Sequence, residues 1–294
     1  MKTKSVKLIF SILFVYFMTI PIHAQNSFQK FNLKLSGGYG IIAGGDMPAT
    51  TDGVNDVLAD LAALEGFTVT EKLENAKWGA EFGAEFIFNI NRKFSVSLGM
   101  EYIRKATDSI AAIELGSLAR LSLEWEPEYT AIPIMLSGYY FIPLGQNTKG
   151  YVKAGAGYYF AKIKYTIREE EEVLGIAYYE QQDGEAKDNG FGFHGGLGLE
   201  YSVAANIALF AEGTGRYVNL NDWDVENRTS SSMGDADETG KFWYAEEYNE
   251  GTDKFYATMQ LSEEKPDDPS LRNVRKAKIS LSGFALKLGI KIGF

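Results

Sequence analysis

Charged residues of both signs recur at alternate positions within otherwise apolar stretches of this sequence. In an extended chain, side chains placed at every second residue project from the same face. Charges in a space with little water are tolerated when each one lies beside a partner of opposite sign. Five acids and five bases have this spacing, which predicts a network of ion pairs; they are Glu81, Glu85, Glu101, Glu200 and Glu212 with Lys34, Lys153, Arg216, Lys287 and Lys291.

His194 belongs to the same polar face and is one of only two histidines in the chain. A histidine beside a serine and a carboxylate could act as a general base in a lipid-modifying enzyme. The sequence has no Gly-x-Ser-x-Gly turn that would present such a serine, and it has no cysteine nucleophile. We therefore interpret His194 as part of the charged network, hydrogen-bonded to a neighbouring glutamate, and predict no catalytic residues.

Composition excludes several further functions. The absence of cysteine removes disulfide scaffolds and thiolate metal sites. The net charge of −10 argues against a nucleic acid partner, because phosphate binding needs a basic surface. The acidic segments 169–172, 235–238 and 267–268 could hold calcium or magnesium weakly, but a solvated acidic surface is the simpler explanation. We expect no metal site and no cofactor.

The elements that must position the charged residues are strands with a period of two. From Trp78 to Phe88, apolar residues alternate with glycine and glutamate over most of the run, so that one face is apolar and the other is polar or open. Eight runs of this kind follow one another along the chain, which predicts eight antiparallel strands. Their residues are approximately 31–39, 78–88, 94–102, 132–142, 152–160, 191–201, 207–217 and 284–294.

An eight-stranded barrel can be soluble, with its apolar face around a ligand, or can span a membrane, with that face toward lipid. The balance of five acids and five bases favours the membrane, because a narrow lumen needs paired charges whereas a face in water does not. Glycines on the polar face would relieve crowding in such a lumen. The predicted fold class is all-β, an eight-stranded antiparallel transmembrane β-barrel with long extracellular loops.

Residues 1–24 have the pattern of a signal peptide. Three lysines precede an apolar run at 8–20, and Ala24 supplies a small residue at a cleavage site. The alternative is an uncleaved membrane anchor, for which the apolar run is short. We expect export, a barrel domain at residues 25–294, and no later segment long and apolar enough to form a transmembrane helix.

The connections between the predicted strands alternate between short and long. In membrane barrels the short turns face the periplasm and the long loops face outward, so both chain ends are expected in the periplasm. The long connections hold 34 of the 39 Asp and Glu residues but only 12 Lys and Arg, which predicts a strongly acidic outer surface. The short connections are 90–93, 143–150 and 202–206, and the long ones are 42–77, 105–128, 168–189 and 219–275.

Some local structure is predicted inside the long connections. Apolar residues at helical spacing indicate an amphipathic helix at 52–65 over the barrel mouth. Alternating apolar residues at 121–125 indicate a hairpin that continues two strands above the membrane. Aromatic residues at 242–244 and 255–256 indicate an extracellular hairpin; if that hairpin entered the membrane, the barrel would have ten strands instead of eight.

Two segments resemble a known family. Residues 129–136, followed by the aromatic residues 139–141, resemble the Tyr-x-x-Ile-Pro-x-x-Leu strand of the outer-membrane β-barrel (porin-like) family common in Bacteroidota. The final residues resemble the closing strand that the barrel-assembly machinery recognises, which implies an assembly signal at Leu288, Ile290, Ile292 and Phe294. The chain is similar in architecture to small barrels of the OmpA, OmpX and OmpW kind. The family motifs specify a barrel but no shared catalytic residues.

We therefore expect a non-enzymatic integral outer-membrane protein with a structural or surface-interaction role. Ion pairs would close its lumen, and its acidic loops would meet solutes, divalent cations, lipopolysaccharide or macromolecular partners. The expected partners also include the lipid bilayer and the barrel-assembly machinery, but no nucleic acid. One alternative is a narrow porin-like channel for small solutes or ions, in which the lumen pairs exchange partners to open. A remote alternative is a lipid-modifying enzyme centred on His194.

Overall fold

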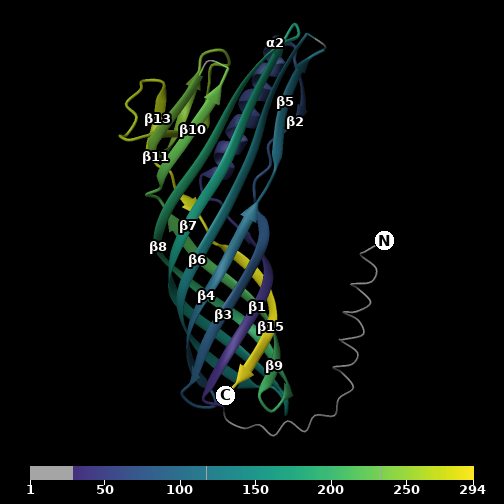
Figure 1. Ribbon diagram of the computed structural model, residues 1–294, viewed down its shortest axis with the longest axis vertical. Helices are drawn as coiled ribbons and strands as arrows, with labels where there is room; N and C mark the ends of the chain where they lie inside the picture. Colours follow the sequence, from purple (N-terminus) through teal and green to yellow (C-terminus); the bar gives the residue numbers. More distant parts are fainter. Residues whose placement is uncertain (1–28, 117, 233) are drawn as a thin grey trace.

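A computed structural model describes residues 29–294 apart from residues 117 and 233. Eight antiparallel strands pair in the order β1, β3, β4, β6, β7, β8, β9, β15 and return to β1, so that the sheet closes into a barrel (Figure 1). The predicted eight-stranded barrel is confirmed. The signal peptide expected at residues 1–24 lies outside the described residues. The barrel strands are β1 (Phe31–Ile42), β3 (Trp78–Asn89), β4 (Phe94–Ala106), β6 (Ala119–Pro143), β7 (Thr148–Val173), β8 (Ile176–Ala204), β9 (Ile207–Leu220) and β15 (Gly283–Gly293).

The apolar face of the barrel points outward. Leu98, Leu136 and Leu288 expose 60%, 65% and 68% of their surface, whereas Glu81 on the opposite face of β3 is fully buried. A continuous belt of exposed apolar side chains is unfavourable in water and is matched by the hydrocarbon of a membrane. The structure therefore has the orientation of a transmembrane barrel and not that of a soluble ligand-carrying one.

Three barrel strands are far longer than a membrane requires. Strands β6, β7 and β8 have 25, 26 and 29 residues, although a tilted strand of about 9–11 residues crosses a bilayer. They continue as one sheet beyond the barrel at the end opposite the carboxyl terminus (Figure 1). The connection expected at 168–189 is therefore mostly strand, with a tight turn between Val173 and Ile176. The connection at 105–128 contains β5 (Ser109–Leu115), which pairs with β6 as the predicted hairpin.

A smaller group of strands extends this sheet from the edge formed by β8. Strand β10 pairs with β8, β11 pairs with β10, and β12 pairs with β11. The β11–β12 hairpin is the one predicted from its aromatic residues, and it lies outside the closed ring, which keeps eight strands. These additional strands are β2 (Thr68–Glu71), β10 (Asp224–Ser231), β11 (Gly234–Asn249), β12 (Lys254–Ser262), β13 (Leu271–Lys276) and β14 (Ile279–Ser280).

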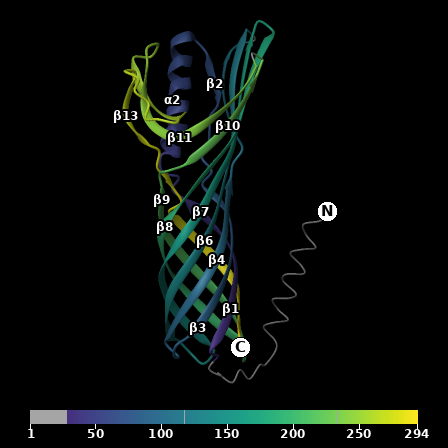
Figure 2. The same ribbon diagram turned by 60° about the vertical axis from the view of Figure 1, so that its left-hand side comes forward.

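Helix α2 (Met47–Glu65) stands between the two edges of this extended sheet (Figure 2). It begins five residues earlier than predicted, because Pro48 fits the first turn. Its last residue, Glu65, is followed by Gly66, whose left-handed conformation ends the helix. Its residues Leu58 and Ala62 pack in one apolar cluster with Ala111 and Ile113 of β5. On the side of β12, Gly53 meets the backbone of Ala257, where any Cβ would overlap the carbonyl oxygen.

The helix thus closes a second enclosure above the barrel, which we call the chamber. Its wall is formed by α2 with the extended parts of β6, β7, β8, β10, β11 and β12. A buried apolar layer that includes Tyr159, Ile163, Trp223 and Leu281 lies between the chamber and the charged part of the lumen. Within the described residues, no helix is long and apolar enough to cross a membrane.

The closing strand yields a first prediction. Phe294 points outward with 67% of its surface exposed, and its backbone N–H donates to the Phe31 carbonyl at 2.8 Å. Replacing Phe294 with serine keeps this backbone bond but removes the terminal aromatic side chain. We expect folding and membrane insertion to slow severalfold, measured as the fraction of heat-modifiable folded protein over time. Phe255→Ser, which changes an aromatic residue outside the barrel, is the control; equal insertion rates for the two variants would contradict the assembly signal.

The attachment of α2 should depend on pH. Lys254 and Tyr256 of β12 donate hydrogen bonds to Asp60 at 2.8 and 2.5 Å, and these bonds lower the pKa of Asp60. The contact is therefore intact above the ordinary aspartate pKa of about 3.9 and is lost as the pH falls below the lowered value.

Hydrogen exchange of the α2 amides tests this attachment. At neutral pH, Asp60→Asn should speed exchange in α2 severalfold, and Asp52→Asn on the same helix should not. Unchanged exchange in the Asp60→Asn variant would show that this contact does not hold the helix.

Candidate functional site: the barrel lumen and the chamber above it

The middle of the lumen holds a compact ion-pair cluster. Lys34 pairs with Glu212 and lies 3.5 Å from Glu85, while Lys153 lies 2.7 Å from Glu212 and 3.7 Å from Glu85. All four side chains expose 7% or less of their surface. Two acids and two bases cancel, which is how charges are accommodated away from water. Nearer the end with the short turns, Lys291 pairs with Glu200.

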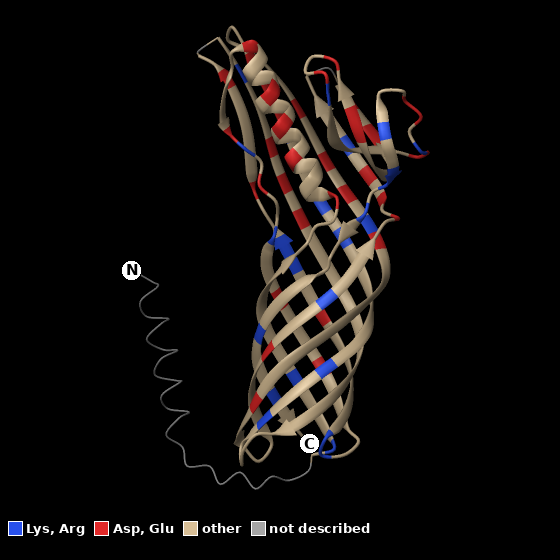
Figure 3. Ribbon diagram, turned by 180° about the vertical axis from the view of Figure 1, so that it is seen from behind, with Lys and Arg blue, Asp and Glu red and all other residues tan. Residues whose placement is uncertain are grey.

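Nearer the chamber, a second cluster surrounds Glu81. Arg216 donates two hydrogen bonds to its carboxylate, at 2.8 and 2.9 Å. Lys105 lies 3.0 Å from the same carboxylate, and Lys287 bridges Glu81 at 3.6 Å and Glu101 at 2.5 Å. Blue and red segments accordingly follow one another along the barrel strands (Figure 3). The structure thus brings together, in contacting pairs, all ten charged residues that the sequence analysis assigned to the network.

Lys105 is a charged lumen residue that the sequence analysis missed. It was counted in the second long connection, but β4 continues to Ala106 and its side chain is 1% exposed. The signal was present, because Lys105 keeps the period of two that begins at Ser95 and passes through Glu101. With Lys105, the lumen contains five acids and six bases, which is one base more than the sequence analysis predicted.

Two tyrosines complete the middle cluster and were also missed. Tyr139 donates to Glu85 at 2.5 Å, and Tyr151 donates to Glu212 at 2.7 Å. Lys34 in turn donates to both hydroxyls, at 3.3 and 3.1 Å. Their rings fill lumen space that ion pairs alone would leave open. The signal was again the period of two, because Tyr139 alternates with the outward residue Tyr140, which is 37% exposed.

His194 has a different partner from the one expected. Its Nε2 lies 2.7 Å from the Ser137 hydroxyl, and its Nδ1 has no hydrogen-bond partner. The glutamate partner predicted from the sequence is therefore wrong. Strand register explains the difference, because β6 and β8 both pair with β7 at Gly155, whose lack of a side chain lets the imidazole reach across to Ser137. Ser137 is 2% exposed, whereas His194 is only partly buried.

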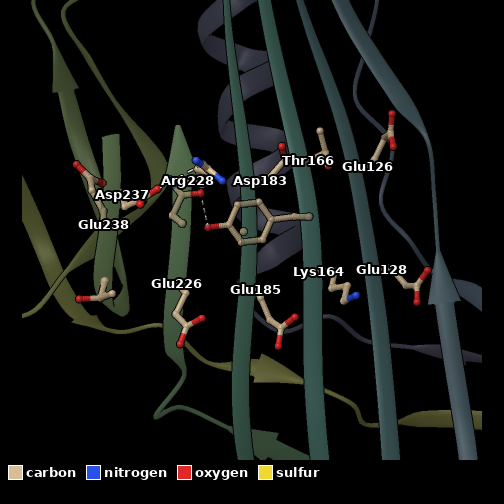
Figure 4. Close-up of a pocket in the computed structure, with 14 residues that line it drawn as sticks. Glu126, Glu128, Lys164, Thr166, Asp183, Glu185, Glu226, Arg228, Asp237 and Glu238 are labelled. Carbon is tan, nitrogen blue, oxygen red and sulfur yellow. Dashed lines mark hydrogen bonds and ion pairs between the residues drawn. The ribbon is translucent and has the colours of Figure 1, made fainter. Parts of the chain in front are cut away.

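The chamber holds a cavity of about 690 Å³. Its wall combines apolar and aromatic side chains with a few carboxylates and amides. On the outer face of the same strands, a shallow groove is lined by seven carboxylates and two cations, Lys164 and Arg228 (Figure 4). Hydrogen bonds from Lys162 and Lys187 lower the pKa of Glu185 to about 2, so this carboxylate stays ionised well below neutral pH.

One set of three carboxylates has the spacing of a metal site. Asp108, Glu124 and Glu126 present oxygens within 4.8 Å of one another, and they are the one such group among the described residues. Arg168 donates to Glu124 and Glu126 at 2.7 Å each, so a cation of the protein already neutralises them. The acidic segments 169–172, 235–238 and 267–268, considered from the sequence, do not gather into a group of this kind.

A closed barrel with an apolar outer belt and a polar lumen defines an integral outer-membrane barrel. The model of the outer membrane protein beta-barrel domain family matches residues 10–238, more than half of the chain. The chain belongs to this family, and its location is the outer membrane.

Solved structures with a similar chain path have low sequence identity. Neisserial surface protein A is 12% identical, with 90% of this chain and 97% of that chain covered and a TM-score of 0.36. OprG from Pseudomonas aeruginosa is 13% identical, with coverages of 92% and 98% and a TM-score of 0.36. A major outer membrane protein from Thermus thermophilus is 13% identical, with coverages of 90% and 99% and a TM-score of 0.40. No curated protein matches this sequence.

The middle cluster yields a stability prediction. Glu85→Ala leaves Lys34 and Lys153 sharing the single carboxylate of Glu212 and removes the acceptor of Tyr139. Breaking a buried pair from one side costs about 3–5 kcal/mol, whereas an exposed pair contributes about 1 kcal/mol or less. We therefore expect Glu85→Ala to lower the free energy of unfolding by about 3–5 kcal/mol. The control Glu128→Ala, which breaks an exposed pair with Arg104, should lower it by about 1 kcal/mol or less. Urea unfolding in lipid vesicles measures both; equal effects would contradict a tightly coupled lumen.

Proposed function

We propose that this protein is a non-enzymatic outer-membrane barrel with a closed lumen, and that its function is to bind ligands in the chamber at the cell surface. The observation that carries the proposal is the sequence of obstructions along the barrel. Lys291 and Glu200, the middle cluster around Glu212, the cluster around Glu81 and then the apolar layer lie one after another. An ion that crossed this path would have to separate buried pairs or displace apolar side chains.

The orientation in the membrane follows from the chain ends. The first described residues and Phe294 lie at the barrel end with the short turns, where Phe31 and Phe294 are joined by a backbone hydrogen bond. We place this end in the periplasm and the chamber outside the cell, in keeping with the usual arrangement of such barrels. The acidic surface then faces the medium, where divalent cations and lipopolysaccharide are the expected partners. The outward apolar belt contacts the bilayer, and the barrel-assembly machinery recognises β15.

The absence of enzymatic activity is also part of the proposal. The Ser137 and His194 pair has the chemistry of a nucleophile and base, which gave the lipid-modifying alternative its basis. However, Ser137 is buried and faces the lumen, so a lipid in the outer leaflet has no contact with its hydroxyl. We therefore assign this pair a role in lumen packing.

Single-channel recording tests the closed lumen. Protein refolded into planar bilayers should give a silent membrane, with insertion verified by heat-modifiable migration. Lys287→Ala should raise leakage, because it leaves Glu101 without its ion-pair partner and opens space beside it. Steady openings of the unmodified protein, with conductance proportional to salt concentration, would refute the closed lumen and favour the channel alternative.

A further inference from the structure

The cavity in the chamber has the size and lining of a small-molecule site. Its volume of about 690 Å³ falls within the range of about 300–1,000 Å³ that is common for ligand pockets. Helix α2 and strands from both halves of the extended sheet contribute to its wall. Because segments distant in the sequence enclose one space, the cavity is a feature of the assembled chamber and not of a single loop.

The base of the cavity is apolar and aromatic. Tyr165 lies between Trp125 and Phe242, with ring centroids at 5.8 and 5.9 Å. Trp125 and Phe242 are only partly buried, as are Met259 and Leu261, although all four pack against the buried apolar layer on one side. Their remaining apolar surface faces the cavity, and an apolar group of a ligand would remove it from water.

Carboxylates from three strands lie in the wall of the same cavity. Glu169 of β7 and Glu180 of β8 are directly opposite each other in the strand register, and Glu238 comes from β11. Among the residues that the structure describes, none of these three carboxylates forms an ion pair. Gln182 donates an amide hydrogen bond to Glu180 at 2.8 Å. Partial loss of hydration around its carboxylate, followed by repulsion from Glu180, raises the pKa of Glu169, although the residue as a whole is exposed.

We propose that the chamber binds a small organic cation with an apolar body, such as an aromatic or aliphatic amine. The ammonium group would lie between Glu169 and Glu180, and the apolar body would contact the rings of Trp125, Tyr165 and Phe242. Cations are attracted both by carboxylates and by the faces of aromatic rings. This inference rests on the proposed ligand-binding role of the chamber and adds the chemical class of its ligand.

The other ligand classes fit the cavity less well. A neutral apolar molecule would use the aromatic base but would leave the carboxylates without a partner. An anion would be repelled by Glu169, Glu180 and Glu238. The groove on the outer face of the same strands holds seven carboxylates but only two cations, and such an excess of negative charge raises the local concentration of cations.

Three probes that share one apolar body distinguish these classes. Phenylbutylamine is a cation at neutral pH, phenylbutanol is neutral and phenylbutyrate is an anion. Each is titrated calorimetrically into the full barrel in zwitterionic nanodiscs, with empty nanodiscs subtracted. We expect the amine to bind about tenfold more tightly than the alcohol, which corresponds to one modest charge interaction, and the carboxylate to bind weakest.

Two sets of variants assign the selectivity to the cavity. The double variant Glu169→Gln and Glu180→Gln should remove the advantage of the amine while leaving the affinity for the alcohol unchanged. Glu170→Gln alters the next residue of β7, which does not line the cavity, and should keep the advantage. Phe242→Ala should weaken the amine and the alcohol alike, because both use the apolar base.

Each outcome supports or overturns the proposal. Equal binding of the amine and the alcohol by the unmodified protein, or no binding above empty nanodiscs, would overturn the cation site, and this test does not depend on folding of any variant. An amine advantage that survives the double substitution would place the site elsewhere and also overturn it. Conductance in planar bilayers would instead refute the closed lumen, but it would not change the result of the titration. A failure of the closed lumen can therefore be distinguished from a failure of the cation site.

Discussion

Buried charges in the lumen must be paired, and this constraint governs the rest of the barrel. An eight-stranded barrel has little interior space beyond what its side chains fill, so water cannot hydrate an isolated ammonium or carboxylate there. Lys34 meets this requirement with Glu212 and Glu85, and Arg216 meets it with Glu81. Tyrosine hydroxyls donate further hydrogen bonds to Glu85 and Glu212. The same paired side chains also fill the lumen, and this is the basis for proposing that the lumen is closed and that the protein acts through the chamber.

The chamber is a continuation of the barrel wall and not a set of independent loops. Strands β6, β7 and β8 run through both parts, so the position of the chamber above the membrane is set by the same hydrogen-bond register that closes the barrel. In the chamber, however, the side chains that line the cavity are apolar, uncharged polar or carboxylate groups, and no lysine or arginine is among them. One sheet therefore encloses two interiors with different chemistry, separated by the layer around Trp223.

The lumen residues that could be predicted from the sequence are those that follow a regular alternation of inward and outward positions. Glu81, Glu85 and the other inward charges keep a period of two, so their shared face could be inferred without knowing their partners. Lys105 keeps the same period but was missed because its strand was predicted to end earlier. Tyr139 was missed because only the outward residues of its strand were considered. The partner of His194 could not be predicted, since Ser137 is 57 residues away and contacts it across an intervening strand.

The sequence by itself determined the eight strands, the outward apolar face, the charged lumen and the acidic surface, because alternation and charge depend only on neighbouring positions. The tertiary structure decided which acid meets which base and where the chamber closes. Asp60 and Tyr256 are 196 residues apart, and Gly53 meets Ala257 only when α2 stands between β5 and β12. Such contacts depend on how strands separated in sequence are aligned when the sheet closes, and a local pattern carries no information about that alignment.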